Sequence, residues 1–267
     1  MITQNQDTNA HVGQYLSFPD HALLVTSIFS TIQGEGPFAG TPATFIRLAG
    51  CNRGRKIGMG CSFCDTNFKI NEGTLMTFDY IERQVEKLAS APLLVITGGE
   101  PFLQKNVVGF LKRVLGAGLH GIKNIQIESN GDCGPEELLT LNQDINASKM
   151  GFTIVISPKA EKTFRPIHKN LKDMPSVFKF LISGDESSPY FNIPYDYLGT
   201  YNHLPKVYLS PLTAYNRPVS PGEIADAWTP GLINVEETRR NYKRAIKLCF
   251  EYNFQLSLQT HLFLGVE

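Results

Sequence analysis

Residues 44–66 read TFIRLAGCNRGRKIGMGCSFCDT. The mostly apolar start of this stretch predicts a strand, and the cysteines that follow are spaced C-x9-C-x2-C at Cys51, Cys61 and Cys64. Thiolates in such a loop bind either zinc or an iron–sulfur cluster. A structural zinc ion usually takes four protein ligands, and no further Cys or His lies nearby in the sequence. Two interpretations stay open, an iron–sulfur cluster with one open iron and a zinc loop with a distant fourth ligand.

The whole chain sets outer limits on the function. Its 267 residues carry a formal net charge of zero, which gives no electrostatic reason to expect nucleic acid or an anionic membrane surface as a partner. No run is long and apolar enough to cross a bilayer, and the polar first residues contain no visible signal peptide. Cys133 and Cys249, outside the loop, are interpreted as ordinary thiols, which favours a reducing cytoplasm. We expect an extension over residues 1–22 and one domain over residues 23–267.

Alternating strands and helices predict parallel βαβ units in an α/β fold. After an apolar run at 22–29, strands are expected at 44–48, 93–96, 122–127, 153–156, 177–182, 206–209 and 255–259. Helices are expected at 78–89, 105–115 and 235–252, with Thr77 as the N-cap of the first and a short helix starting at Pro135. Later connections are longer and less helical, so any barrel should be incomplete.

Polar residues follow these strands repeatedly. Thr97-Gly98-Gly99-Glu100-Pro101 ends one strand, Glu128-Ser129-Asn130-Gly131 the next, and Ser157-Pro158-Lys159 another. Active sites of parallel barrels lie at the carboxyl ends of the strands. We therefore expect the functional site at this edge, beside the cysteine loop.

The cysteine loop, together with Gly98-Gly99-Glu100-Pro101, resembles the radical S-adenosylmethionine (SAM) enzymes. Within them, the ordered segments QGEG (33–36), FIRLAGCN (45–52), CDT (64–66), TGGEP (97–101), ESNG (128–131), SPK (157–159) and QTH (259–261) are similar to the 7-carboxy-7-deazaguanine synthases. The likeness covers about residues 24–267. It departs in the first cysteine gap, which is nine residues here and three in the usual superfamily spacing, and which we interpret as an insertion.

The resemblance implies a partial parallel β/α barrel and a lyase of queuosine and 7-deazapurine biosynthesis. The expected reaction contracts the ring of 6-carboxy-5,6,7,8-tetrahydropterin to 7-carboxy-7-deazaguanine with loss of ammonia. Cys51, Cys61 and Cys64 would hold a 4Fe–4S cluster, whose open iron binds SAM and whose electron cleaves it. Thr66 would bind Mg2+. An electron donor such as flavodoxin and a homodimer are also implied.

The resemblance assigns site residues by position. Cofactor contacts are expected from Gly98, Gly99, Glu100, Ser157, Pro158 and Lys159. Substrate contacts are expected from Ile32, Gln33, Gly34, Glu35, Arg47, Thr97, Asn130 and the terminal carboxylate of Glu267. Glu128 and His261 are the expected catalytic residues, with Glu128 handling protons. Residue type alone leaves other roles open for three of these residues. Arg47 could form a structural salt bridge, and Lys159 could be a solvated surface lysine. The hydroxyl of Thr66 could cap a helix or stabilise a turn.

Two other functions compete. A glycyl-radical activating enzyme would share the cluster loop and the Gly-Gly-Glu segment, but not Gln33-Gly34-Glu35 or Arg47. A non-enzymatic metal-binding module would hold a metal stably in air and would cleave no cofactor.

Overall fold

The computed structural model describes residues 15–53, 61, 64, 68–88, 91–160, 162–200, 205–217 and 226–266. These residues form one nine-stranded sheet in the order β3-β1-β2-β4-β5-β6-β7-β8-β9. The strands are β1 (Ala22–Ile32), β2 (Pro42–Leu48), β3 (Thr74–Thr77), β4 (Leu93–Gly98), β5 (Asn124–Ser129), β6 (Gly151–Ile156), β7 (Ser176–Ile182), β8 (Val207–Pro211) and β9 (Gln255–Leu256). The edge strands β3 and β9 are not neighbours, so the sheet is an open, partial barrel.

From β2 to β9, every neighbouring pair of strands is parallel. This confirms the predicted parallel sheet of an incomplete barrel. At the other edge, β1 pairs antiparallel with both β2 and β3, which the sequence interpretation did not anticipate. The carboxyl ends of the parallel strands therefore share one edge of the sheet.

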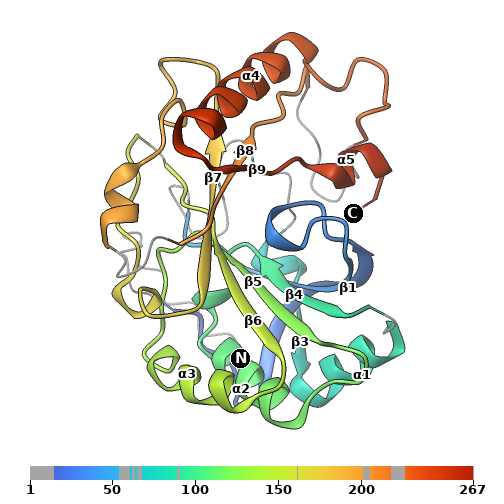
Figure 1. Ribbon diagram of the computed structural model, residues 1–267. Coiled ribbons are helices and arrows are strands. Elements are labelled where there is room, and N and C mark those ends of the chain that lie inside the picture. Colours follow the sequence, from blue (N-terminus) through green and yellow to red (C-terminus); the bar gives the residue numbers. More distant parts are fainter. Residues whose placement is uncertain are drawn as a thin grey trace.

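The helices are α1 (Phe78–Leu88), α2 (Asn106–Ala117), α3 (Leu138–Ala147), α4 (Val235–Tyr252) and α5 (Thr260–Leu264). Short 3-10 turns are η1 (Gly36–Phe38), η2 (Ile70–Glu72), η3 (Pro101–Leu103), η4 (Lys169–Leu171) and η5 (Tyr195–Thr200). Figure 1 shows α1, α2 and α3 together along one side of the sheet, and α5 beside the segment that follows β1. Among the described residues, we find no helix long and apolar enough to cross a membrane.

Helix α1 begins as its sequence predicts. The hydroxyl oxygen of Thr77 accepts the backbone N–H of Tyr80 at 3.3 Å, which satisfies one of the unpaired donors of the first turn. Ile81 and Val85, four residues apart, are fully buried on one face. The predicted N-cap is thereby confirmed.

The main core lies between the sheet and the helices. Alternate strand residues such as Ile96, Ile127 and Phe180 join side chains of α1, α2, α3 and α4 in one buried cluster. The other face of the sheet has small apolar clusters, one around Phe45 and Val95 and one around Val155. Because strand side chains alternate between faces, the polar residues between these positions are left on this second face.

Two sequence expectations differ from the structure. The last strand was expected over 255–259, but β9 has only Gln255 and Leu256. The apolar tail instead forms α5, which buries Leu262 and ends at Gly265 in the left-handed conformation. The short helix expected to start at Pro135 is α3 and begins at Leu138, after a turn in which the N–H of Leu138 bonds the carbonyl of Pro135.

The expected N-terminal extension is partly described. Leu16 forms a bridge with Gln104, and its N–H bonds the carbonyl of Leu103 at 2.8 Å. Residues 15–21 thus contact the domain body before β1 begins at Ala22. Residues 1–14 lie outside the described residues, and the predicted boundary at residue 22 stays a prediction.

Candidate active site

The candidate site lies on the polar face of the sheet, near the carboxyl ends of the strands. In β7, Phe178 and Phe180 point to the helices, so Lys179 between them points to the opposite face. Thr97 of β4 and Glu128 of β5 lie on the same face as Lys179. The side chains of Thr97 and Glu128 are hydrogen-bonded to each other there. Strand alternation thus places side chains from separate loops and strands in one region.

Glu128 is held by three donors from three elements. Its Oε1 accepts the amide Nε2 of Gln33 at 3.1 Å and of Gln126 at 3.0 Å, and its Oε2 accepts the hydroxyl of Thr97 at 2.9 Å. Gln126 is fully buried and Gln33 nearly so. These bonds fix the orientation of the carboxylate, since each donor comes from a rigid strand or its end.

Glu35 forms a second polar cluster. Lys179 donates a short charged hydrogen bond to its Oε2, and the hydroxyl of Ser210 donates to Oε1 at 3.2 Å. Burial acts to raise the pKa of Glu35, but the positive charges of Lys179, His261 and Lys159 outweigh it and hold the pKa below its usual value. Glu35 is therefore an ionised acceptor at neutral pH.

The side chain of Gln33 joins the two clusters. Its Nε2 donates to Glu128, while its Oε1 accepts the backbone N–H of Glu35 at 3.1 Å. The amide thus bonds on both sides, which determines which end carries the oxygen. Four of the predicted substrate and catalytic residues, Gln33, Glu35, Thr97 and Glu128, therefore lie in one connected network.

His261, in α5, closes against the same region. The backbone N–H and the hydroxyl of Thr260 both bond the carbonyl of Gly34, at 3.1 and 3.0 Å. A Cβ on Gly34 would lie 2.1 Å from Nδ1 of His261, so only glycine leaves room for the imidazole. The predicted grouping of His261 with residues 33–35 is present, and α5 brings it there.

Gly98 and Gly99 let β4 approach the end of β2. A Cβ on Gly98 would lie 2.2 Å from the carbonyl oxygen of Leu48, and one on Gly99 would lie 2.1 Å from that of Gly50. Gly98 also has φ of +142°, which L side chains rarely adopt. Both glycines thus allow a close approach to the backbone that leads to Cys51, while their predicted contact with the cofactor stays a prediction.

Glu100 is fully buried and contacts protein donors. Its Oε1 accepts the hydroxyl of Ser129 at 2.9 Å and the N–H of Phe102 at 3.1 Å, while Oε2 accepts the N–H of Asn130 at 2.7 Å. Burial raises the pKa of Glu100 to about 7, against the effect of these bonds. The structure thus gives the carboxylate a role in tying the end of β4 to the loop after β5. Its predicted contact with a cofactor ammonium stays a prediction.

The thiol loop lies next to these strand ends. Cys51 is buried, Cys61 half-buried and Cys64 exposed, and the N–H of Cys64 bonds the carbonyl of Cys61 at 3.0 Å. Burial, followed by the nearby charges of Glu100 and the other two thiols, raises the pKa of Cys51 to about 12. Among the described residues, no three His, Cys, Asp or Glu side chains are grouped closely enough to hold one metal ion.

The three thiols nevertheless suit an iron–sulfur cluster chemically. Cysteine thiolates are the ligands such clusters take, and Cys61 and Cys64 lie near enough to contribute to the raised pKa of Cys51. The first thiol leaves a rigid strand end at Gly50, while the second and third share a turn. The three thiols therefore fit the expected 4Fe–4S cluster. Residues 54–60, between Cys51 and Cys61, lie outside the described residues.

Behind the loop lies a buried polar layer that sequence reasoning missed. The guanidinium of Arg53 forms a two-bond ion pair with Asp132, at 2.7 and 2.8 Å, and both side chains are about 2% exposed. Asn52 accepts the side-chain amide of Asn130 at 2.8 Å. The predicted substrate residue Asn130 therefore anchors the start of the thiol loop. The sequence offered one signal for this polar layer. Arg53 follows Cys51 and Asn52 directly, at the start of the thiol loop.

Other predicted residues lie at the expected edge. Lys159 donates to the carbonyl and hydroxyl of Ser157 at 3.0 and 2.6 Å, and burial lowers the pKa of its ammonium to about 8, with Lys179 adding to the effect. Pro158 is buried between them. Arg47 lies beside Thr97 in the parallel register and stacks over Phe29 at 5.2 Å.

Ile32 is the last residue of β1, directly before Gln33. The predicted magnesium ligand Thr66 and the predicted terminal contact Glu267 lie outside the described residues. Sequence reasoning missed Gln126, Lys179 and Ser210. Each is a polar residue next to apolar neighbours in a strand, and that alternation was the available signal.

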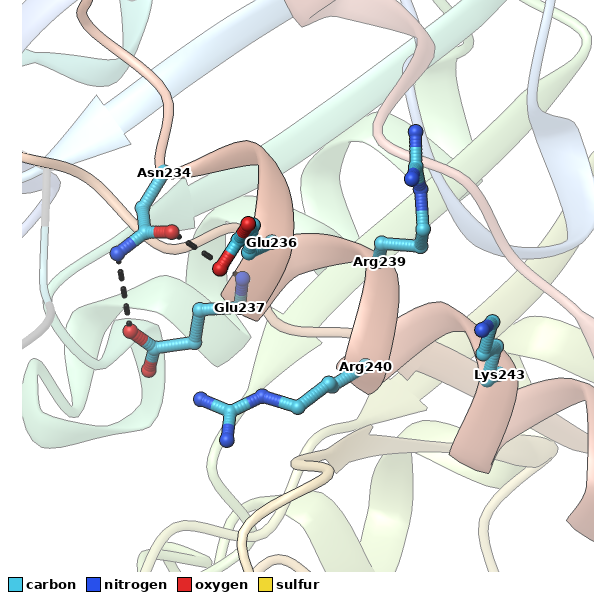
Figure 2. A pocket seen from close by; sticks show the side chains of 6 residues that line it. All are labelled: Asn234, Glu236, Glu237, Arg239, Arg240 and Lys243. Carbon is cyan, nitrogen blue, oxygen red and sulfur yellow. Dashed lines mark hydrogen bonds between the residues drawn. The ribbon is translucent and has the colours of Figure 1, made fainter.

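A separate surface hollow of about 440 Å3 lies at the start of α4 (Figure 2). It is lined by Asn234, Glu236, Glu237, Arg239, Arg240 and Lys243. Asn234 caps the helix by accepting the N–H of Glu237 at 3.1 Å. None of the six is a predicted site residue, and they lack the thiols and the connected carboxylates of the strand ends. We therefore assign the site to the strand ends.

The partial barrel with a three-thiol loop beside its carboxyl edge defines a radical SAM enzyme. In agreement, the family model of the Radical SAM superfamily matches residues 46–160. The crystal structure of QueE from Escherichia coli has the same fold, with a TM-score of 0.58 and 19% identity over 89% of this chain and 94% of that one.

Sequence relatives identify the family within this class. The 7-carboxy-7-deazaguanine synthase of Rickettsia prowazekii (strain Madrid E) is 36% identical over 92% of this chain and 89% of its own length. The synthase of Chlorobaculum tepidum is 35% identical over 52% of this chain and 69% of its own. The chain belongs to the 7-carboxy-7-deazaguanine synthase family. These relatives favour neither a glycyl-radical activating enzyme nor a non-enzymatic metal-binding module.

Proposed function

We propose that the protein converts 6-carboxy-5,6,7,8-tetrahydropterin to 7-carboxy-7-deazaguanine with loss of ammonia. The observation that carries this proposal is the Gln33 amide, which connects Glu35 and Glu128 beside the thiol loop. A pterin edge offers an N–H and an amino group side by side, and ionised carboxylates accept from such donors strongly.

Cys51, Cys61 and Cys64 would hold the 4Fe–4S cluster, and SAM would bind against the edge formed by Gly98, Gly99 and residues 157–159. When bound, the cluster and SAM would provide the radical that abstracts a hydrogen atom from the substrate. The remaining tasks belong to the protein. Lys159, with two of its three N–H groups on Ser157, has one left to donate to the cofactor.

Substrate binding is proposed for residues 32–35, Arg47, Thr97 and Asn130. Arg47 would bind the substrate carboxylate, since a guanidinium can form two parallel bonds with it. His261, against Gly34, would close the pocket, and we propose that the Glu267 carboxylate completes it. Closure of this kind excludes water from the reacting atoms.

Glu128 is proposed to manage protons during the rearrangement. The hydroxyl of Thr97 can both donate to it and accept from it, so the carboxylate can gain or lose a proton without losing this partner. Its fixed orientation favours transfer to one substrate position.

Three further features complete the proposal. Mg2+ would bind through Thr66, substrate oxygens and water, because magnesium prefers oxygen ligands and keeps several waters. A one-electron donor such as flavodoxin would reduce the cluster, and the enzyme would work as a homodimer. Sedimentation of the reconstituted protein tests the dimer, which a monomer at micromolar concentration would exclude.

The test is anaerobic reconstitution with iron and sulfide, followed by reduction and addition of SAM, Mg2+ and the tetrahydropterin. Mass spectrometry should detect both 5′-deoxyadenosine and 7-carboxy-7-deazaguanine. If 5′-deoxyadenosine forms without the deazaguanine, the radical chemistry is retained and the substrate assignment is wrong.

A further inference from the structure

Lys179 is a buried lysine in the middle of β7, with its side chain only 10% exposed. Burying an ammonium is costly unless it is paired and hydrogen-bonded. Its partner is Glu35, which lies 144 positions away in the sequence, in the turn after β1. An ion pair beside the proposed substrate site therefore joins the turn after β1 to β7, two parts of the sheet that are separated by four other strands.

The pair leaves Glu35 able to bind something else. An ionised carboxylate has about four acceptor positions, and Lys179 and Ser210 occupy one on each oxygen. Among the described residues, Lys179 and Ser210 are the donors found on this carboxylate, and the side chain is 15% exposed. Glu35 therefore keeps acceptor capacity for a ligand beside these two residues.

The charges around Glu35 come from four elements. Lys179 lies on β7, Lys159 follows β6, His261 lies in α5, and Tyr242 of α4 is close enough for its ionisation to be affected by Glu35. The positive groups hold the pKa of Glu35 below its usual value, and Lys179 has the largest such effect. Loss of the Lys179 charge should therefore move the pKa of Glu35 upward.

We propose that Lys179 is a specificity-determining positioning residue, which with Ser210 fixes Glu35 as a permanent acceptor for the paired N–H donors of the pterin edge. The identity of the substrate in this inference rests on the proposed function. The ion pair between Lys179 and Glu35 is observed independently of it. A protonated Glu35 would carry an O–H donor on one oxygen, so it could no longer accept from both N–H donors as a carboxylate does. Lys179 thus selects a substrate edge that donates over one that accepts.

The first experiment compares Lys179→Met with the wild type in the reconstituted enzyme. The KM for 6-carboxytetrahydropterin should rise at least tenfold, with kcat within about threefold, because binding is lost while the reacting groups remain. When pH 8 and pH 6 are compared, the KM of the variant should rise more on acidification than that of the wild type, because loss of the Lys179 charge moves the pKa of Glu35 upward. Lys206→Met, which removes an exposed lysine at the base of β8, is the matched control and should change neither value.

The second experiment needs no substrate. Lys179→Met leaves a charged Glu35 without its partner and should lower the melting temperature, and Glu35→Gln added to it should recover part of that loss. A KM equal to that of the wild type at both pH values would overturn the inference and leave the proposed function intact. If the wild type makes no deazaguanine, the proposed function and the pterin specificity both fail, while recovery in the double variant would still establish the ion pair.

Discussion

The side-chain amide of Gln33 donates to the carboxylate of Glu128 at 3.1 Å, although the two residues are 95 positions apart in the sequence. Gln33 ends the antiparallel part of the sheet and Glu128 lies in its parallel centre. Gln126 and Thr97 complete a set of three donors on this one carboxylate. The orientation of Glu128 therefore depends on the relative placement of three strands.

Substitution of this carboxylate should separate two steps of the reaction. Glu128→Gln keeps the size of the side chain but removes its charge and its ability to take up a proton. We expect formation of 7-carboxy-7-deazaguanine to fall about 100-fold or more, the usual size of a general acid–base contribution, while 5′-deoxyadenosine still forms. Both products are measured by mass spectrometry. Glu86→Gln, on the exposed face of α1, is the control, and near-normal turnover by Glu128→Gln with unchanged pH dependence would refute the assignment.

Gly99 offers a test of the contact between β4 and the thiol loop. In Gly99→Ala the new Cβ would lie 2.1 Å from the carbonyl oxygen of Gly50 and 2.7 Å from Cβ of Cys51, so the backbone must move. Overpacking of this kind should lower the free energy of unfolding by about 1–3 kcal/mol, and the displaced Cys51 should reduce iron bound per chain.

The control for this change is Gly116→Ala. A Cβ at Gly116, inside α2, would meet nothing within 4 Å. Alanine is the better helix former by about 1 kcal/mol, so this variant should be slightly stabilised and should bind iron normally. Urea unfolding and iron analysis measure both. Equal iron content in the two variants would contradict the proposed contact.

The ammonium of Lys159 should give the enzyme an alkaline limit. Its pKa of about 8, lowered mainly by burial, means that the positive charge is present below this pH and is lost as the pH rises through it. The kcat/KM for SAM should therefore decline above about pH 8, since this ratio reports groups of the free enzyme. In Lys159→Arg the side chain stays charged, so the decline should disappear whatever the absolute activity. An unchanged alkaline limit in this variant would exclude Lys159 as its cause.

Magnesium affinity should depend on the substrate. A single neutral hydroxyl, that of Thr66, is too weak a ligand to hold Mg2+ tightly without the oxygens of the substrate. We expect calorimetric titration to give at least tenfold tighter binding with the tetrahydropterin present. Equal affinity with and without it would contradict the assignment, and Thr66→Val should abolish the difference.

Additions at the carboxyl terminus should be harmful. His261 packs against Gly34, and the proposed contact of Glu267 places the final carboxylate in the pocket. Several residues appended after Glu267 should raise the KM for the tetrahydropterin at least tenfold, with the melting temperature unchanged. The same residues added before Met1 provide the comparison. Full activity with the appended residues would rule out a terminal carboxylate in the site.

Much of the fold follows from local pattern. The bounds of α4 match the predicted helix because charged residues alternate with a narrow apolar face, and buried strands such as β4 were visible as short apolar runs. A strand was predicted over 255–259, but only Gln255 and Leu256 form β9. The residues that follow form α5, which buries Leu262 and bonds Gly34 through Thr260, and these long-range contacts were not visible in the local pattern.

The candidate site was predictable where a segment has an unusual composition, as at residues 33–36 and 97–101. Lys179 and Gln126 were missed because each lies between apolar strand residues, and the fold decides which groups their side chains face. The partners of Glu100 were missed for a related reason. Its carboxylate was expected to bind a ligand, but it caps the local turn by accepting the N–H of Phe102, and the fold brings the hydroxyl of Ser129 and the N–H of Asn130 into range.

The bond from Thr260 to Gly34 joins residues 226 positions apart, so the segment that packs beside the proposed substrate site is synthesised long after Gly34. The strands that carry Thr97, Glu128 and Lys179 are all synthesised before α5 and can pair before it exists. A nascent chain can therefore form most of its sheet before α5 reaches Gly34. Synthesis of α5 is thus a precondition for closing the proposed substrate site.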